Sequence, residues 1–241
     1  MSAGVETSAA PAAAAQAPRL AYSFCRMVCR LVVHTFFRAR VHHANRVPAS
    51  GPVLLVCNHQ SYVDPVLAGQ GLWRECHFMA RDTLFRGYFE RLIRFLNAFP
   101  VKRGTADIAA VKETLRRLRS GALVTVFPEA TRSTDGSIAP MQAGVVLLAR
   151  KTGAPLVPCM IDGAFEAWPR HAKLPRPRRI VIAYGEPMHV ATNAQESDDA
   201  FIERVRLEII ALMDRYGKRR AHPPQRSGAE PHGSSPAPTS A

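Results

Sequence analysis

The sequence predicts an α/β fold in which helices flank a largely parallel central sheet. Short apolar runs of strand length alternate along the chain with helical stretches, which is the pattern of βαβ crossovers between parallel strands. The chain has 241 residues, a length that suits one domain with short additions, and its hydrophobic content of 47% is enough for a core. We therefore predict one α/β domain over 48–218.

The first element is a predicted amphipathic helix within 19–47. It carries a basic stripe at every fourth residue, formed by Arg26, Arg30, His34 and Arg38. Its other side is apolar and consists of Leu20, Phe24, Val28, Leu31 and Val32. A helix that spanned a bilayer would bury each of these charges at about 2.5–3.5 kcal/mol. We therefore expect an interfacial helix whose arginines lie among lipid head groups; the alternative is an amphipathic helix packed on its own domain.

Five apolar runs are predicted strands, at 52–57, 76–80, 122–127, 156–161 and 179–184. Helices are predicted at 105–120 and 142–151, and a last helix begins at Ser197 and ends at Gly217. In sheets of this kind, ligands bind outside the carboxyl ends of the strands. The residues that follow each predicted strand are therefore the first candidates for chemistry.

The two chain ends are predicted to be disordered tails. Residues 1–18 and 219–241 are rich in small residues and proline and show no apolar periodicity. No small-residue cleavage site follows the first helix at a suitable distance, so secretion is not expected.

The charge of the chain indicates an anionic partner. Thirty-two Lys and Arg against nineteen Asp and Glu give a net charge of +13, and no acidic residue occurs from Thr7 to Val63. Anionic lipid, nucleic acid and phosphorylated small molecules all fit this charge. The five cysteines are an odd number and form no Cys-x-x-Cys pair, which argues against a disulfide framework or a zinc ribbon and favours a reducing compartment.

A histidine and an aspartate follow the first predicted strand. His59 and Asp64 would point about 140° apart on a continuous helix, but they can meet at a strand-to-helix corner. Asp64 could then orient the imidazole and raise its basicity, which would make His59 a general base. The alternative is a loop histidine and a helix cap before Pro65.

Further polar residues leave the same predicted edge of the sheet. The strand at 122–127 is followed by Glu129, Thr131 and Arg132, and an upstream loop at 98–104 carries Lys102 and Arg103. Arg103 and Arg132 could hold a phosphate, because guanidinium groups match phosphate oxygens in pairs. The alternative for both is ordinary surface charge.

These residues resemble the glycerolipid acyltransferases typified by 1-acyl-sn-glycerol-3-phosphate acyltransferase. Four sequence blocks of that family occur in order across 58–161. They are Asn58-His59-x-Ser61-x-x-Asp64, the apolar segment 99–103 that ends in Arg103, the segment 127–133, and Val157-Pro158. The third block departs from the family pattern because Ala130 replaces a glycine. If that glycine serves the fit of the acceptor, this chain binds a modified or different head group.

The resemblance implies a function and a set of roles. A fatty acyl group would move from acyl-CoA or acyl-carrier protein to the free hydroxyl of 1-acyl-sn-glycerol-3-phosphate, giving phosphatidic acid for phospholipid biosynthesis. His59 would be the base that Asp64 orients, with no covalent acyl-enzyme. Glu129 would position an arginine or a substrate hydroxyl. The implied substrate-binding residues are Asn58, Ser61, Lys102, Arg103, Glu129, Thr131 and Arg132.

The implied partners are a lyso-lipid acceptor, an acyl thioester donor, which acyl-carrier protein could supply, and an anionic membrane surface. No metal and no cofactor beyond the acyl co-substrate are expected. The basic amphipathic stretch from Arg81 to Leu96 could rest on anionic lipid or line an acyl-chain groove; equally, it could be a helix packed on the sheet. We expect peripheral or monotopic attachment at the cytoplasmic face of the cell membrane.

Two other functions remain open. One is acyl transfer to another lyso-lipid, such as a lyso-ornithine lipid or a lysophospholipid with a larger head group. The other is a basic lipid- or nucleic-acid-binding protein without catalysis. Nucleic acid is not an expected partner, because no known nucleic-acid-binding module is visible and only 7% of the residues are aromatic.

Overall fold

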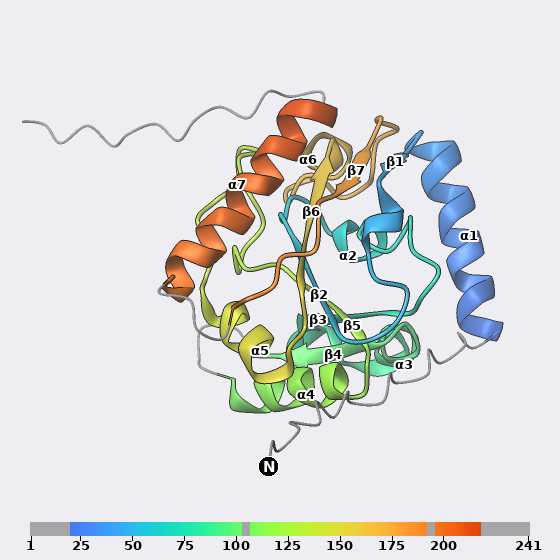
Figure 1. The fold of residues 1–241 in the computed structure, drawn as a ribbon. Coiled ribbons are helices and arrows are strands. Elements are labelled where there is room, and N and C mark those ends of the chain that lie inside the picture. The colour runs from blue at the N-terminus through green and yellow to red at the C-terminus, as the bar shows by residue number, and fades with distance from the viewer. Residues whose placement is uncertain (1–19, 103–106, 192–195, 218–241) are drawn as a thin grey trace, which may run out of the picture.

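The structure is a computed structural model that describes residues 20–102, 107–191 and 196–217. The predicted tails at 1–18 and 219–241 lie outside these residues. The described residues form a seven-stranded sheet with helices on both faces (Figure 1), in the strand order β1-β7-β6-β2-β5-β3-β4. The strands are β1 (Arg40–His42), β2 (Val53–Cys57), β3 (Cys76–Arg81), β4 (Ala98–Val101), β5 (Leu123–Val126), β6 (Leu156–Asp162) and β7 (Val181–Tyr184).

Neighbouring strands run parallel, except that β6 and β7 are antiparallel. The predicted α/β class with a largely parallel sheet is therefore confirmed. Strands β2, β5 and β6 lie side by side, and each residue of β2 is fully buried. Burial on both faces explains why these strands read as continuous apolar runs.

Two strands were not among the predicted ones, β1 and β4. Both lie at the edges of the sheet. The three residues of β1 include an arginine and a histidine, and β4 contains Pro100, in a segment that the sequence predicts as a loop. Edge strands tolerate charge and proline because one side of each strand needs no ladder hydrogen bonds. Polar residues therefore interrupt β1, and Pro100 interrupts the apolar run of β4.

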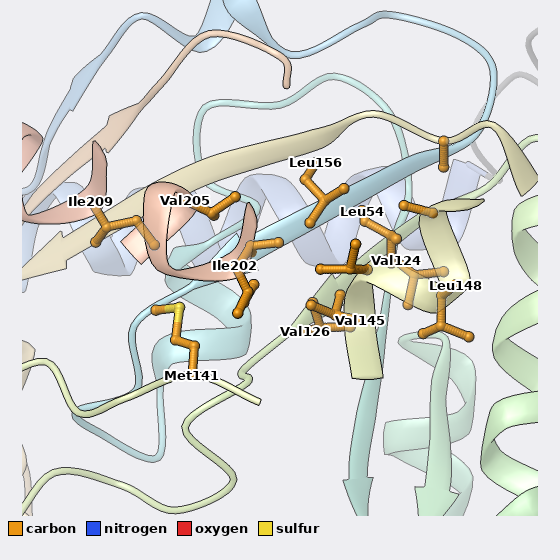
Figure 2. Packing of buried hydrophobic residues seen from close by; sticks show 14 of the residues in the cluster. Leu54, Val124, Val126, Met141, Val145, Leu148, Leu156, Ile202, Val205 and Ile209 are labelled. Atoms are coloured by element: carbon orange, nitrogen blue, oxygen red, sulfur yellow. The ribbon is translucent and has the colours of Figure 1, made fainter. Parts of the chain in front are cut away.

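The helices are α1 (Leu20–Phe36), α2 (Asp64–Leu67), α3 (Gly87–Phe95), α4 (Ile108–Arg119), α5 (Gly144–Thr152), α6 (Ala164–Ala167) and α7 (Asp198–Tyr216), with short 3₁₀ turns at Ala44–Arg46 and Asp82–Leu84. Side chains that alternate along β2 pack into two separate cores. Leu54 and Val56 face a core that α4, α5 and α7 cover, while Leu55 and Cys57 face one that α1, α2 and α6 cover. Figure 2 shows the first core, in which side chains of α5 and α7 lie against those of the strands.

Helix α1 lies where the sequence predicts it, but its orientation differs from the expected one. Arg26 donates to the carbonyl of Trp73 at 2.5 Å, and Arg30 donates to the carbonyls of Gln70 at 3.0 Å and Leu72 at 2.8 Å. Both arginines therefore pack on the domain, as in the alternative interpretation, and the expectation that they lie among lipid head groups is wrong. The physical reason is that the turn before β3 presents backbone carbonyls that accept hydrogen bonds from the guanidinium donors.

The apolar side of α1 consequently faces outward. Its exposed residues are Leu20, Phe24, Met27, Val28, Leu31, Val32 and Phe36. In the part of the chain that the structure describes, no helix combines the length and the apolar character needed to cross a membrane. Within the stretch from Arg81 to Leu96, α3 buries Ile93 against the protein and leaves Tyr88 and Phe89 exposed.

Candidate active site

The His59–Asp64 pair lies at the corner between β2 and α2. His59 Nδ1 is 2.8 Å from Asp64 Oδ2, and the same oxygen accepts hydrogen bonds from the backbone N–H groups of Gln60 at 2.5 Å and Ser61 at 2.7 Å. Asp64 is fully buried, and His59 is 8% exposed. Because a carboxylate only accepts hydrogen bonds, Nδ1 of His59 carries the proton and Nε2 carries the free lone pair. This is the geometry of a general base with an oriented imidazole.

The imidazole is also held from the side by an aromatic ring. The ring of Phe127, the first residue after β5, stacks on the ring of His59 with centroids 4.3 Å apart and an interplanar angle of 29°. The sequence pattern attached no role to Phe127. Its position directly after a strand next to β2 in the sheet is the signal that could have indicated one.

Glu129 connects two backbone segments. Its Oε1 accepts the N–H of His59 at 2.7 Å, and its Oε2 accepts the N–H of Ala139 at 3.0 Å. Glu129 was expected to position an arginine or a substrate hydroxyl, but in the structure its carboxylate positions the backbone of His59 instead. Burial raises the pKa of the Glu129 carboxyl to about 7, although the two N–H donors favour the ionised form.

Asn58 and Ser61 make their hydrogen bonds within the protein. The side chain of Asn58 pairs with the backbone of Ile161 in β6, with Nδ2 donating to the carbonyl at 2.9 Å and Oδ1 accepting the N–H at 2.8 Å. Ser61 Oγ donates to the carbonyl of Trp168 at 2.8 Å. Both residues are fully buried. These contacts fix the loop that carries His59.

The candidate phosphate-binding residues lie in separate loops. Arg132 is half-buried, and its guanidinium carbon lies 3.5 Å from the ring centroid of Tyr62. Its Nη1 is buried and has no hydrogen-bond partner within the described residues. Thr131 and Lys102 are exposed, whereas Arg103 lies outside the described residues. The sequence pattern attached no role to Tyr62, although its aromatic ring falls between the histidine and the aspartate of the first block.

A cavity of about 760 Å³ opens beside His59 on the α4 and α5 face of the sheet. Apolar side chains provide much of its lining, among them Met79, Val101, Val111, Val126, Val145 and Leu148. Lys102 and His59 line the same cavity, so the structure brings these two predicted site residues together. An apolar cavity with a few polar groups at one end is the common form of a site for a ligand with a hydrocarbon part.

Ala130 has a φ of 58°, which is the left-handed conformation that favours glycine. The glycine that the resemblance expects at this position would adopt it without strain. Ala130 lines the cavity next to Pro128.

Residues that could ligate a metal do not gather anywhere in 20–102, 107–191 or 196–217: no group of three or more His, Cys, Asp or Glu side chains is suitably placed there.

The sequence model of a protein family described as Acyltransferase matches residues 38–162, which is more than half of the chain. The chain belongs to this acyltransferase family. The matched residues run from just after α1 to the end of β6 and contain the His59–Asp64 pair, Glu129, Arg132 and the cavity lining. The candidate site of this acyltransferase therefore lies within the residues that match the family.

Relatives of this acyltransferase carry a more specific name. A protein of Bacillus subtilis called 1-acyl-sn-glycerol-3-phosphate acyltransferase is 28% identical over 70% of this chain and 83% of its own length. A chloroplastic protein of Arabidopsis thaliana with the same name is 27% identical over 76% of this chain and 51% of its own. A crystal structure of the 1-acyl-sn-glycerophosphate acyltransferase of Thermotoga maritima superposes with a TM-score of 0.67 at 23% identity and covers 83% of each chain, which establishes the shared fold.

Proposed function

We propose that this acyltransferase moves a fatty acyl group from an acyl thioester to the free hydroxyl of 1-acyl-sn-glycerol-3-phosphate, giving phosphatidic acid. The observation that carries the proposal is the buried His59–Asp64 pair, whose imidazole lines an apolar cavity. The names of the Bacillus subtilis and Arabidopsis thaliana relatives support the choice of acceptor. Acyl-CoA and acyl-carrier protein are both proposed donors.

The mechanism follows from the tautomer of His59. Nε2 takes the proton of the acceptor hydroxyl as its oxygen attacks the thioester carbonyl, and the Asp64 carboxylate stabilises the imidazolium that forms. The tetrahedral intermediate then collapses, the carbon–sulfur bond breaks, and the thiolate takes the proton from the imidazolium. Atoms and charges balance without a covalent acyl-enzyme or a metal ion, so we propose the acyl thioester as the sole co-substrate.

Arg132 is the group that we propose for the acceptor phosphate. Its buried Nη1 lacks a partner among the described residues, and a buried donor without an acceptor costs about 1–3 kcal/mol. A phosphate oxygen that approaches the accessible side of the half-buried guanidinium would meet its other N–H donors. Lys102 is exposed at the cavity and is proposed as a second cation there, and Arg103 remains a proposal from the sequence.

The apolar cavity is proposed to hold a fatty acyl chain, which places a thioester or ester end beside His59. The buried polar residues around the base are proposed to position rather than to bind. Asn58, Ser61 and Glu129 all satisfy backbone or loop groups next to His59. Replacing these side chains should therefore displace His59 more than it weakens substrate binding. Thr131 is exposed and keeps its proposed role in binding the acceptor.

We also propose that the enzyme works at an anionic membrane surface, on the cytoplasmic face of the cell membrane. The outward side of α1 is apolar, and the loop between α6 and β7 holds five Lys or Arg and no acidic residue from 168 to 180. The N–H of Ile180 bonds to the carbonyl of Phe37 at 3.1 Å, so this basic loop adjoins the end of α1. Apolar burial and charge attraction can therefore act on one surface.

The experiment is an acceptor panel with labelled acyl-CoA and acyl-carrier protein as donors. The purified enzyme should acylate lysophosphatidate from at least one donor, and the His59→Ala variant should do so at least about 10²-fold more slowly. A chelator should leave the turnover unchanged. If lysophosphatidate is not acylated while a lyso-ornithine lipid or a larger lysophospholipid is, the acceptor is wrong and Ala130 becomes the first residue to examine. Binding of lipid or nucleic acid without any turnover would support the non-enzyme alternative.

A further inference from the structure

Tyr62 stands beside the arginine that the proposed function assigns to the acceptor phosphate. It lies in the loop after β2, between His59 and Asp64, and its side chain is 55% exposed. The Arg132 guanidinium carbon lies 3.5 Å from the centre of the Tyr62 ring, the shortest cation–ring distance within the described residues. The other exposed tyrosine contact, Arg91 over Tyr88 in α3, is 5.9 Å.

The ring of Tyr62 is itself held by its neighbours. Its centroid is 5.9 Å from that of Trp168, and the residue before it, Ser61, bonds to the carbonyl of Trp168 at 2.8 Å. Trp168 in turn donates from Nε1 to the carbonyl of Ala172 at 3.0 Å. Tyr62 is therefore an exposed ring on a fixed support.

A ring under a guanidinium constrains the cation in a particular way. The aromatic face attracts the positive charge but leaves the in-plane N–H donors unused. The guanidinium is therefore oriented while its donors have no hydrogen-bond acceptor. A carboxylate partner would instead occupy the donors that an anionic ligand needs. The unpartnered Nη1 of Arg132 agrees with the aromatic case.

We propose that Tyr62 is a positioning residue for the acceptor, which holds the Arg132 guanidinium flat so that its free donors meet the acceptor phosphate. The proposal rests on the proposed function, because it takes the phosphate-bearing acceptor from there. It assigns the effect to the ring face and not to the hydroxyl. It also places acceptor recognition within the same loop as the base.

The test compares Tyr62→Leu and Tyr62→Phe, with Tyr88→Leu as the matched control on an exposed tyrosine that lies farther from its arginine. Tyr62→Leu should raise the KM for lysophosphatidate about tenfold, with kcat, the KM for the acyl donor and the melting temperature almost unchanged. Tyr62→Phe should keep the parent KM because the ring is retained. Tyr88→Leu should have no effect on these constants.

A double-mutant cycle separates positioning from a general structural effect. In an Arg132→Ala background, Tyr62→Leu should add nothing further to the KM, because the group that it positions is gone. Additive effects, an equal loss in Tyr62→Phe, or a fall in kcat at constant KM would each overturn the proposal.

The proposed function is judged separately by wild-type turnover. If the wild type acylates lysophosphatidate and Tyr62→Leu has the parent KM, only the Tyr62 proposal fails. If the wild type shows no turnover on lysophosphatidate, the proposed function fails, and the melting temperature with glycerol 3-phosphate decides the Tyr62 proposal. The ligand should then stabilise the wild type more than Tyr62→Leu, and equal shifts, or none, would overturn it.

Discussion

Asp64 Oδ2 accepts three hydrogen bonds, from one imidazole and two backbone amides, and this gives His59, the proposed base, a defined orientation. The two amides hold the carboxylate whether or not the imidazole is present. The orientation of His59 is therefore built into the backbone of the corner after β2. Changes at this corner should act on turnover more than on folding.

We expect His59→Ala to lower kcat by about 10²–10⁴-fold. Asp64→Asn should lower kcat less, by a factor near the lower end of that range. The asparagine can still accept backbone hydrogen bonds but cannot stabilise an imidazolium charge. Circular dichroism and kcat should be measured together, with the exposed His189→Ala as the control. A folded His59→Ala variant with near-normal turnover would refute the mechanism.

A second effect at a single residue is the conformational strain of Ala130. An L-residue in the left-handed region costs about 1–2 kcal/mol, whereas glycine adopts it freely but loses about 0.5–1 kcal/mol of chain entropy. Ala130→Gly should therefore stabilise the protein by about 0.5–1 kcal/mol, or roughly 1–4 °C in melting temperature. Ala211→Gly, at an exposed position inside α7, should instead destabilise it by about 1 kcal/mol. Calorimetry that found both variants destabilised would contradict this account.

At the scale of the element, α1 shows that an amphipathic helix has two candidate inner sides. Arg26 and Arg30 donate hydrogen bonds to backbone carbonyls of the turn before β3. Val33 and the following Phe37 pack into the core at the C-terminal end of the helix. Its outward side remains apolar. An apolar outer side on a docked helix is suited to lipid contact.

We expect the outward, apolar side of α1 to bind vesicles. Phe24→Ser with Leu31→Ser should weaken vesicle binding by more than tenfold without changing the melting temperature, because each side chain contributes about 1.5–3 kcal/mol when buried in lipid. Leu207→Ser, exposed on α7, is the control. Arg26→Gln with Arg30→Gln should instead speed hydrogen exchange in α1. Unchanged flotation of the serine variant would show that the apolar side is not the lipid-binding one.

At the scale of the whole molecule, the site depends on strands that are distant in the sequence but adjacent in the sheet. Glu129 after β5 holds the backbone of His59 after β2, and Asn58 pairs with Ile161 in β6. The buried carboxyl of Glu129 also ties stability to pH. Its pKa is about 7 in the folded state against an ordinary value of 4.5, so the folded state binds this proton more tightly than the unfolded state.

Glu129 should therefore lower the free energy of unfolding as pH rises from about 4.5 to 7, by up to about 3 kcal/mol, and leave it constant above pH 7. Glu129→Gln removes this titration. The free energy of unfolding of the variant minus that of the parent should therefore increase as pH rises across that interval. Denaturant unfolding at pH 5, 6, 7 and 8 measures this difference. A difference that does not vary with pH would show that Glu129 is ionised in the folded state throughout this range.

The sequence by itself determined the central strands and the position of the proposed base. Strands β2, β5 and β6 are buried on both faces, so their apolar runs reveal them, and the strand-to-helix corner brings His59 to Asp64 through local geometry alone. The ligand edge of the sheet followed from the parallel topology.

Only the tertiary structure decided the rest, because the deciding contacts join residues far apart in the chain. The edge strands β1 and β4 exist because neighbours pair with them, not because of their own pattern. The inner side of α1 was decided by carbonyls some 40 residues away, and the contact of Glu129 with the His59 amide by a partner 70 residues away. Periodicity shows that a helix has a polar and an apolar side, and the residue order shows that a carboxylate follows a strand. Which groups the helix side or the carboxylate contacts depends on packing.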